Sequence, residues 1–376
     1  MDDLSQWLIA SKIPGFGTQS LLQFLEKGIS VSDLISASSS ELKHWKFSNS
    51  AIQFLHDEPQ QFIQQDLEWM GENKAIIPLC SEQYPVLLKE INDPPLILYV
   101  QGQIDLIKRS QLGIVGSRNP TNAGKNNAKE FAAALSQSGL MVTSGMALGI
   151  DGAAHEGALS VAEPTIAVMG TGLDRIYPAH HKDLAHKICE NGALVSEFSI
   201  GTGVRPGNFP KRNRIISGLS LGVLVVEAAL KSGSLITAKL AMDQGREVFA
   251  IPGSIHNPLA RGCHSLIRDG AKLVEKANDI LEELSALAII SEQDFKHKDK
   301  VPKDPSSKNK TETSVTLDQE QQAVFDAVDF NVTFVDEIVK QTQLPVAVVS
   351  GTLLLLELEG YIVNEKGGYS KSHPVN

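Results

Sequence analysis

The sequence predicts an α/β protein in which a doubly wound, mainly parallel sheet lies between two smaller helical domains. From Leu112 onward, short apolar runs alternate with helical patterns, as expected for parallel strands joined by crossover helices. The apolar runs are rich in β-branched residues and do not alternate with polar residues, which is typical of sheets covered on both faces. Helical periodicity without such runs precedes and follows this region.

Size and composition limit the possible classes of protein. A chain of 376 residues is long enough for two or three domains. No apolar run approaches the roughly 20 residues that span a bilayer, so we expect no membrane association. The start MDDLSQWLIASK carries acids where an export signal needs basic residues. Cys80, Cys189 and Cys263 form no metal-type or redox-type pair, which favours a cytoplasmic location.

Residues 1–66 are predicted to form an N-terminal helical domain. The segments LSQWLIASK and TQSLLQFLEKG have apolar positions at helical spacing, and the turn 13–17 (IPGFG) separates them. The paired glycines resemble the hairpin of SAM-like and helix-hairpin-helix domains, whose backbone N–H groups grip nucleic-acid phosphates. A plain turn between two helices explains the same residues.

Residues 75–287 are predicted to form the central sheet domain. Helical stretches such as NNAKEFAAALSQSG and LITAKLAMDQG separate the strands. The expected strands are 96–100, 112–115, 140–144, 165–169, 193–197, 221–227, 246–251 and 272–274.

The last part of the chain is predicted to be a linker followed by a winged helix. Residues 288–314 lose nearly all large apolar side chains and are expected to be flexible. Residues 315–376 carry three helical patterns and then a hairpin with Gly367-Gly368 at its tip. The third helix has no Arg, Lys, Asn or Gln for base reading and ends at Glu357 and Glu359. We therefore expect this domain to contact protein or to tune DNA binding weakly.

Glycine and small hydroxyl residues gather at the carboxyl ends of the predicted strands. Because the carboxyl ends of parallel strands meet at one edge, these loops should form one rim, where open α/β sheets bind their ligands. Glycine lets the backbone approach a ligand closely and expose N–H groups, which favours phosphate. The loops are 116–118, 144–151, 170–172, 197–214, 232–234 and 252–254.

One of these loops is strongly basic although the chain carries a net charge of −10. No acid occurs between residues 198 and 226, whereas Arg205, Lys211, Arg212 and Arg214 lie within ten positions. This pattern favours a polyanion site at the start of a helix, although a solvated basic loop would have the same composition.

Helical spacing divides the basic residues. Lys211 and Arg214 share a helix face and are predicted to contact the ligand, whereas Arg212 points elsewhere and could pair with a carboxylate. Asn213 could bind a phosphate or a base, or cap the helix. Arg118 follows the first rim strand, where a guanidinium can hold a phosphate bidentately.

Acid–base chemistry is not predicted at this rim. Asp151 is expected to cap a helix. Asp151 and His155 could share a helix face and bind a metal ion, but no third ligand occurs at a spacing typical of metal sites. Glu197 and Glu227 could act as bases, or could pair with Arg118 or Arg212. No nucleophile motif, P-loop or zinc signature is present. We therefore expect no catalytic residue, metal or cofactor.

Five segments carry a resemblance to a known family: GIVGSRNPT (113–121), VTSGMALGIDGAAH (142–155), RPGNFPKRNRIISGLS (205–220), VVEAALKSGSLITAKLAMDQGREVFAIPG (225–253) and NPLARGCHSLIRDGA (257–271). They look like the DNA-processing protein DprA (Smf) family, in register through the whole central domain. The resemblance implies an extended Rossmann-like domain that dimerises and has no catalytic activity. It also implies sequence-independent binding and protection of single-stranded DNA, and loading of RecA during natural transformation. Single-strand-binding protein is a further expected partner.

The resemblance places the family's DNA-contacting arginine on Arg118 and its basic pocket on Lys211 and neighbours. Phosphate contacts should dominate, because Phe209, Tyr177 and Phe198 are the nearby aromatic candidates and Phe209 is expected in the core. The predicted DNA-binding residues are Gly116, Ser117, Arg118, Ser144, Gly145, Asn208, Lys211, Arg212, Asn213, Arg214, Gly233 and Ser234.

Two rival functions remain open at this point. A nucleotide-processing enzyme related to phosphoribohydrolases would carry a Pro-Gly-Gly-x-Gly-Thr-x-x-Glu loop, and the comparable turn at 232–238 lacks that glutamate. A sequence-specific regulator would use the winged helix, which the acidic third helix disfavours.

Overall fold

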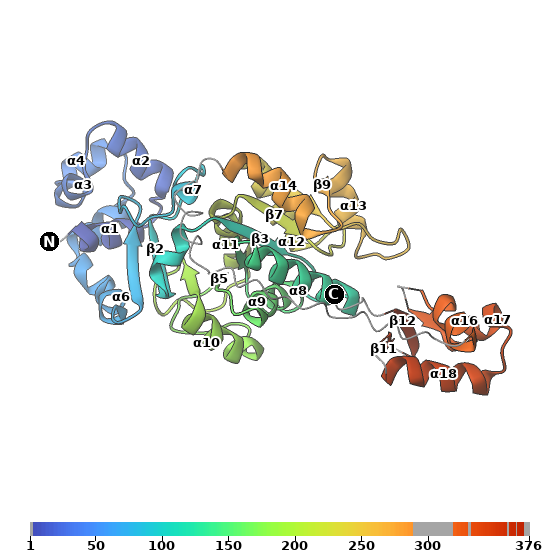
Figure 1. Ribbon diagram of the computed structural model, residues 1–376. Coiled ribbons are helices and arrows are strands. Elements are labelled where there is room, and N and C mark those ends of the chain that lie inside the picture. The colour runs from blue at the N-terminus through green and yellow to red at the C-terminus, as the bar shows by residue number, and fades with distance from the viewer. Residues whose placement is uncertain (1–2, 289–318, 330–331, 359–360, 366, 372–376) are drawn as a thin grey trace, which may run out of the picture. The chain divides into compact units, whose positions relative to one another are not determined.

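The computed structural model describes residues 3–288, 319–329, 332–358, 361–365 and 367–371 (Figure 1). The chain divides into two compact units, Met1–Val301 and Pro302–Asn376. Apart from residue 288, which ends a helix, the predicted linker 288–314 lies outside the described residues.

A nine-stranded sheet organises the first unit, and its strand order is β1-β2-β6-β5-β4-β3-β7-β8-β9. Strands β3 to β9 run parallel to one another, whereas β1 pairs antiparallel with β2 and β2 antiparallel with β6. The strands are β1 (Lys74–Pro78), β2 (Ile97–Gly102), β3 (Gln111–Val115), β4 (Met141–Ser144), β5 (Thr165–Val168), β6 (Ala193–Ser196), β7 (Gly222–Val225), β8 (Glu247–Ala250) and β9 (Lys272–Leu273).

The predicted mainly parallel sheet is thus confirmed. Every expected strand is present, with bounds that differ by a few residues at most. Strand β1 was not predicted from the sequence, because its apolar signal consists of little more than Ile76 and Ile77 at the edge of the sheet.

Helices cover both faces of the sheet, which explains the uninterrupted apolar strands. One face packs against α8, α9, α10 and α14, and the other against α11 and α12. The elements around the sheet are α7 (Val86–Lys89), η2 (Ile104–Lys108), α8 (Asn122–Gln137), α9 (Ile150–Ser160), η3 (Ala179–His181), α10 (Lys182–Asn191), α11 (Asn208–Leu219), α12 (Gly233–Asp243), α13 (Arg261–Arg268) and α14 (Ala277–Ala288).

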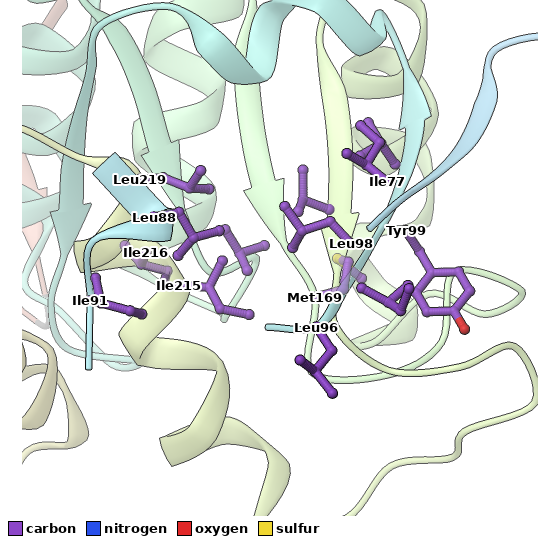
Figure 2. Close-up of a cluster of buried hydrophobic side chains, with 14 of the residues drawn as sticks. Ile77, Leu88, Ile91, Leu96, Leu98, Tyr99, Met169, Ile215, Ile216 and Leu219 are labelled. Carbon is purple, nitrogen blue, oxygen red and sulfur yellow. The ribbon is translucent and has the colours of Figure 1, made fainter. Parts of the chain in front are cut away.

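Helix α11 is held by a dense apolar contact. Figure 2 shows Leu88 and Ile91 beside Ile215, Ile216 and Leu219, all of which are buried. Ile215 and Ile216 therefore anchor this helix. Their burial sets the rotation of α11 about its axis, and with it the direction of every other side chain on the helix.

Six short helices form the N-terminal part, as predicted, and they share one hydrophobic core with the sheet. The predicted boundary at residue 66 falls inside the last of them. At the predicted turn, Phe16 stacks on Phe47 with ring centroids 5.0 Å apart. The elements are α1 (Asp3–Lys12), α2 (Thr18–Glu26), α3 (Val31–Ser36), α4 (Ser39–His44), α5 (Asn49–His56), η1 (Pro59–Phe62) and α6 (Gln64–Trp69).

A buried histidine under the sheet makes the fold sensitive to acid. The Nδ1 of His155 lies 2.8 Å from the Thr165 hydroxyl, which donates to the Val142 carbonyl. Burial lowers the pKa of His155 from 6.5 to about 3. The folded protein therefore binds this proton only well below the pH at which the unfolded chain does, so stability is fully present above 6.5 and is lost as the pH falls toward 3.

We expect this histidine to lower the free energy of unfolding by about 2 kcal/mol between pH 7 and pH 5. Urea denaturation at the two pH values measures the difference. A His155→Gln variant, which keeps a polar group and loses the titration, should show a correspondingly smaller pH dependence. An unchanged pH dependence in the variant would assign the acid sensitivity to other groups.

The second unit is a winged helix, as predicted. Three helices enclose a small core, and a three-stranded sheet in the order β10-β12-β11 forms the wing. Helix α18 exposes Leu354 and Leu355 instead of polar side chains that could read bases. The elements are α16 (Gln319–Ala327), β10 (Thr333–Phe334), α17 (Val335–Thr342), α18 (Val346–Leu358), β11 (Ile362–Glu365) and β12 (Gly368–Lys371).

Within the described part of the chain, no individual helix has the length and apolar character needed to cross a membrane. Helices α17 and α18 meet these criteria only as a pair, and that pair is bent by 114°.

Candidate nucleic-acid interface

A pocket opens at the centre of the sheet, where the order of the strands reverses. From β3 the chain continues to β4 on one side, and it later returns to place β7 on the other side. Crossovers that leave in opposite directions create a crevice at the carboxyl ends of the strands. A cavity of about 740 Å³ lies there, lined by the loops that follow β3, β4, β6 and β7 and by Tyr177 after β5.

The predicted rim is therefore formed by only some of the six loops. The loops 252–254 and 170–172 do not line the pocket, although Gly170 lies against the Phe209 ring, which does. Asn208, a predicted DNA contact, is buried and donates its side-chain amide to the Gly170 carbonyl at 3.0 Å. Its observed contact therefore holds the start of α11 against the loop after β5.

An aromatic and cationic stack forms one wall of the pocket. The exposed Arg118 guanidinium lies 5.8 Å from the ring centroid of Phe209, and the Tyr177 and Phe209 rings are 5.6 Å apart. The expectation that Phe209 packs in the core is wrong, because this half-buried ring lines the pocket. Phe209 lies in the first turn of α11, one position after the buried Asn208. An apolar ring beside a buried residue suggests core packing, and the sequence alone does not show that this ring turns to the pocket.

Arg212 points away from Lys211 and Arg214, as helical spacing predicted, but its face of α11 is the one that meets the pocket, and Arg212 lies at the pocket floor. The side chain is 4% exposed, and its Nη1 donates to the carbonyls of Gly145 and Val168. Burial lowers the pKa of Arg212 to about 10, and the nearby Asp151 carboxylate opposes that shift. Arg212 thereby ties α11 to the carboxyl ends of β4 and β5. The Arg212 guanidinium occupies the space that a side chain at position 145 would need, so this position requires glycine.

Asp151 was predicted to be a helix N-cap, but Gly149 occupies that position. The Asp151 carboxylate instead accepts hydrogen bonds from the backbone N–H groups of Gly145 and Ala147, at 3.1 and 3.3 Å. Burial raises the pKa of Asp151, and Arg212 counteracts this effect. Asp151 and Arg212 are thus two buried opposite charges that stabilise each other electrostatically, and the hydrogen bonds of Asp151 shape the loop after β4.

The two residues that helical spacing favoured as ligand contacts face away from the pocket walls. Arg214 is 15% exposed and forms ion pairs with Glu197 and, at 3.5 Å, with Asp93. Lys211 is exposed on α11, but it is not among the described residues that line the pocket. The charge of Arg214 is therefore largely neutralised within the protein.

The carboxylates considered as bases have structural partners. Glu227 accepts hydrogen bonds from the Thr121 N–H and hydroxyl at 2.9 and 2.7 Å, next to the start of α8. Glu197 pairs with Arg214, and burial raises its pKa. The expected pairings with Arg118 and Arg212 are absent from the described contacts of both carboxylates.

The start of α12 forms another part of the pocket wall. Ser232 caps this helix through the N–H of Ser234 at 3.3 Å, and Gly233 and Ser234 line the pocket as predicted. Exposed Lys231 precedes them and also lines the pocket. Lys231 directly precedes the predicted loop 232–234, and this position in the sequence is the signal that could have placed it at the pocket. Asn213 approaches this wall, with its amide 3.5 Å from the Gly233 carbonyl.

The loop after β3 completes the pocket. Gly116 and Ser117 line it, as predicted. The predicted contact Ser144 is fully buried, and its hydroxyl donates to the Ile114 carbonyl at 2.6 Å, so its observed role is to join β4 to β3. Across the described residues, no cluster of His, Cys, Asp and Glu side chains is arranged to hold a metal ion.

Comparison with known protein families identifies the chain. The family model for DNA recombination-mediator protein A matches residues 75–285, which is more than half of the sequence. The DprA winged helix domain model matches residues 308–368. The chain belongs to the DprA (Smf) family. This family is non-catalytic, which agrees with the structural roles of the carboxylates at the pocket.

Relatives of known name and structure place the chain firmly within the DprA family. Protein Smf of Escherichia coli is 42% identical over 317 residues, covering 83% of this chain and 81% of that protein. The DNA processing protein DprA of Bacillus subtilis is 46% identical over 209 residues, covering 55% of this chain and 70% of that protein. The crystal structure of DprA from Streptococcus pneumoniae superposes with a TM-score of 0.66 at 37% identity, covering 75% of this chain and 99% of that one.

Proposed function

We propose that this protein binds single-stranded DNA without sequence specificity, in the pocket between the loops after β3 and β7. The observation that carries the proposal is the pairing of Arg118 with the Phe209 and Tyr177 rings, in a pocket that the N-terminal end of α12 also lines. This arrangement offers a cation and helix N–H groups for phosphate, and ring faces for a base.

The chemistry of the pocket suits a ligand of any sequence. Arg118 and Lys231 bring positive charge to an acidic protein exactly where the strands end. Phosphate contacts carry no sequence information, and every base has a π-face that can stack on an aromatic ring. The buried Arg212 is compensated by Asp151 and holds the floor of the pocket in place, so the exposed Arg118 and Lys231 are the cations available to a phosphate.

A solved relative supports the same ligand. The structure of DNA processing protein A from Helicobacter pylori is described as showing a unique single-stranded DNA binding mode. It superposes with a TM-score of 0.52 at 30% identity, covering 58% of this chain and 99% of that one.

Fluorescence anisotropy with labelled oligothymidine and a duplex of equal length tests this function. We expect tighter binding of the single strand. The logarithm of its affinity should fall linearly with the logarithm of salt concentration, by about 0.7 per phosphate neutralised. Equal binding of both oligonucleotides, or an affinity that does not change with salt, would contradict the proposal.

We further propose that the protein acts as a homodimer that delivers single-stranded DNA to RecA during natural transformation. The recombination-mediator family supports this role. On DNA coated with single-strand-binding protein, adding this chain should shorten the lag before RecA hydrolyses ATP. An unchanged lag would contradict RecA loading without affecting the DNA-binding proposal, and sedimentation of the free protein measures the dimer.

A further inference from the structure

A buried charge cluster joins the N-terminal helices to the central domain. Lys12, the last residue of α1, places its Nζ 2.6 Å from Oδ2 of Asp66 in α6. Asp66 is 1% exposed, and its Oδ1 accepts the backbone N–H of Ile200 at 2.9 Å. An aspartate of the N-terminal helices therefore holds the backbone of the loop between β6 and α11.

The same loop is fixed at the two neighbouring residues. The Ser199 hydroxyl lies 3.1 Å from Lys12 Nζ and accepts the Tyr99 hydroxyl proton at 3.3 Å. On the other side, Asp174 accepts the Gly201 N–H at 2.9 Å. The stretch 199–201 is thus held from the N-terminal helices and from the loop after β5.

This anchored stretch leads directly to the DNA pocket. Val204 and Pro206 line the pocket, and Phe209 follows in the first turn of α11. The residues between the anchor and the helix form no helix or strand. The Thr202 carbonyl accepts the Gly172 N–H at 3.0 Å. Residues 203–207 are therefore positioned by the contacts at 199–202 on one side, including that of Asp66, and by α11 on the other.

A charged pair is an expensive way to join two layers of a protein, because both ions must lose their water. Apolar side chains could join these layers more cheaply, and many already do so in the shared core. What the carboxylate adds is a hydrogen bond to one backbone N–H of one loop. The pair therefore determines the placement of the loop more than the association of the layers.

We infer that the N-terminal helices contribute to DNA affinity, with Lys12 and Asp66 acting as positioning residues for the pocket loop 198–207. This inference rests on the proposed binding of single-stranded DNA to that pocket. Neither residue touches the DNA. Their effect on affinity passes through Ile200, whose backbone they hold, to Val204 and Pro206.

Two double variants separate placement of the loop from the loss of charge. Lys12→Met with Asp66→Leu removes both charges together with the acceptor for the Ile200 N–H. Lys12→Met with Asp66→Asn removes the same charges and retains an oxygen acceptor. Neither double variant leaves an uncompensated buried ion, because each removes the charges of both residue 12 and residue 66. We expect the leucine pair to bind oligothymidine about fivefold more weakly than the asparagine pair.

The outcomes distinguish this inference from the proposed function. If the unmodified chain fails to bind oligothymidine, the proposed function fails and the inference with it. If the unmodified chain binds and the two double variants have equal affinities, whether both strong or both weak, only the inference is overturned. Weaker binding by the leucine pair alone supports it.

Hydrogen exchange on the unmodified protein provides a test that does not depend on any variant folding. Oligothymidine should slow exchange of the Ile200 amide and of the amides in α6, which lie outside the pocket. The amides of α3, which α4 and α5 separate from α6 in the sequence and which make no contacts to the loop among the described hydrogen bonds, serve as the internal control. Unchanged exchange at Ile200 and α6 in the presence of saturating DNA overturns the inference.

Discussion

Replacing Arg118 with alanine is expected to weaken binding of oligothymidine by ~10–100-fold, the loss typical of one charge-assisted contact. The guanidinium is exposed, and it contacts the Phe209 ring on the wall of the pocket. Its removal should therefore take away a phosphate contact and part of the stacking platform while the fold stays intact. Anisotropy titrations at several salt concentrations measure both the affinity and the salt dependence.

Arg118→Lys is the matched control for this variant. Lysine retains the charge but loses the bidentate geometry and the planar contact with the ring. We expect it to bind with intermediate affinity and with the salt dependence of the unmodified protein. Arg118→Ala should reduce the salt slope by about 0.7, the value for one phosphate on a single strand. Unchanged affinity in the alanine variant would remove Arg118 from the site.

Replacing Arg212 with methionine is expected to lower the free energy of unfolding by about 3–5 kcal/mol, because Asp151 would remain as an unpaired buried charge. The carbonyls of Gly145 and Val168 would also lose their donor. DNA binding should be lost with the shape of the loop after β4. Urea denaturation and anisotropy measure the two effects.

A compensating change distinguishes structural damage from the loss of a DNA contact. Adding Asp151→Asn to Arg212→Met removes the orphaned charge, and asparagine can still accept the N–H groups of Gly145 and Ala147. The double variant should recover part of the lost stability. If Arg212→Met alone unfolds at the same urea concentration as the unmodified chain, the guanidinium does not have the structural role assigned to it.

The two arginines illustrate how far the sequence could identify this site. Arg118 was predicted correctly as a pocket residue, because it follows a strand whose carboxyl end must lie at the rim. The face of α11 that carries Arg212 was not recognised as the one that meets the pocket, although Arg212 lies three and four positions before the buried Ile215 and Ile216. That spacing places all three on the face of α11 that turns toward the sheet. Helical spacing placed Lys211 and Arg214 together on another face, and their charge made that face the predicted ligand contact instead.

Local pattern was sufficient for the architecture of the chain. Apolar runs, helical periodicity and turn residues act over a few positions, and they predicted the sheet, its flanking helices and the winged helix. The strand ends then located the rim, because parallel strands all present their carboxyl ends to one edge. The family motifs added the ligand class to this framework.

Contacts between distant residues were decided only by the tertiary structure. Asp66 and Ile200 are 134 positions apart, and no local pattern indicates that one accepts a hydrogen bond from the other. The same holds for Phe209 beside Tyr177 and for Arg214 beside Glu197. Local sequence patterns were enough to predict the fold and the edge of the sheet where DNA is proposed to bind. Packing determined which side chains reach that edge, because the rotation of a helix depends on the neighbours that bury its apolar face.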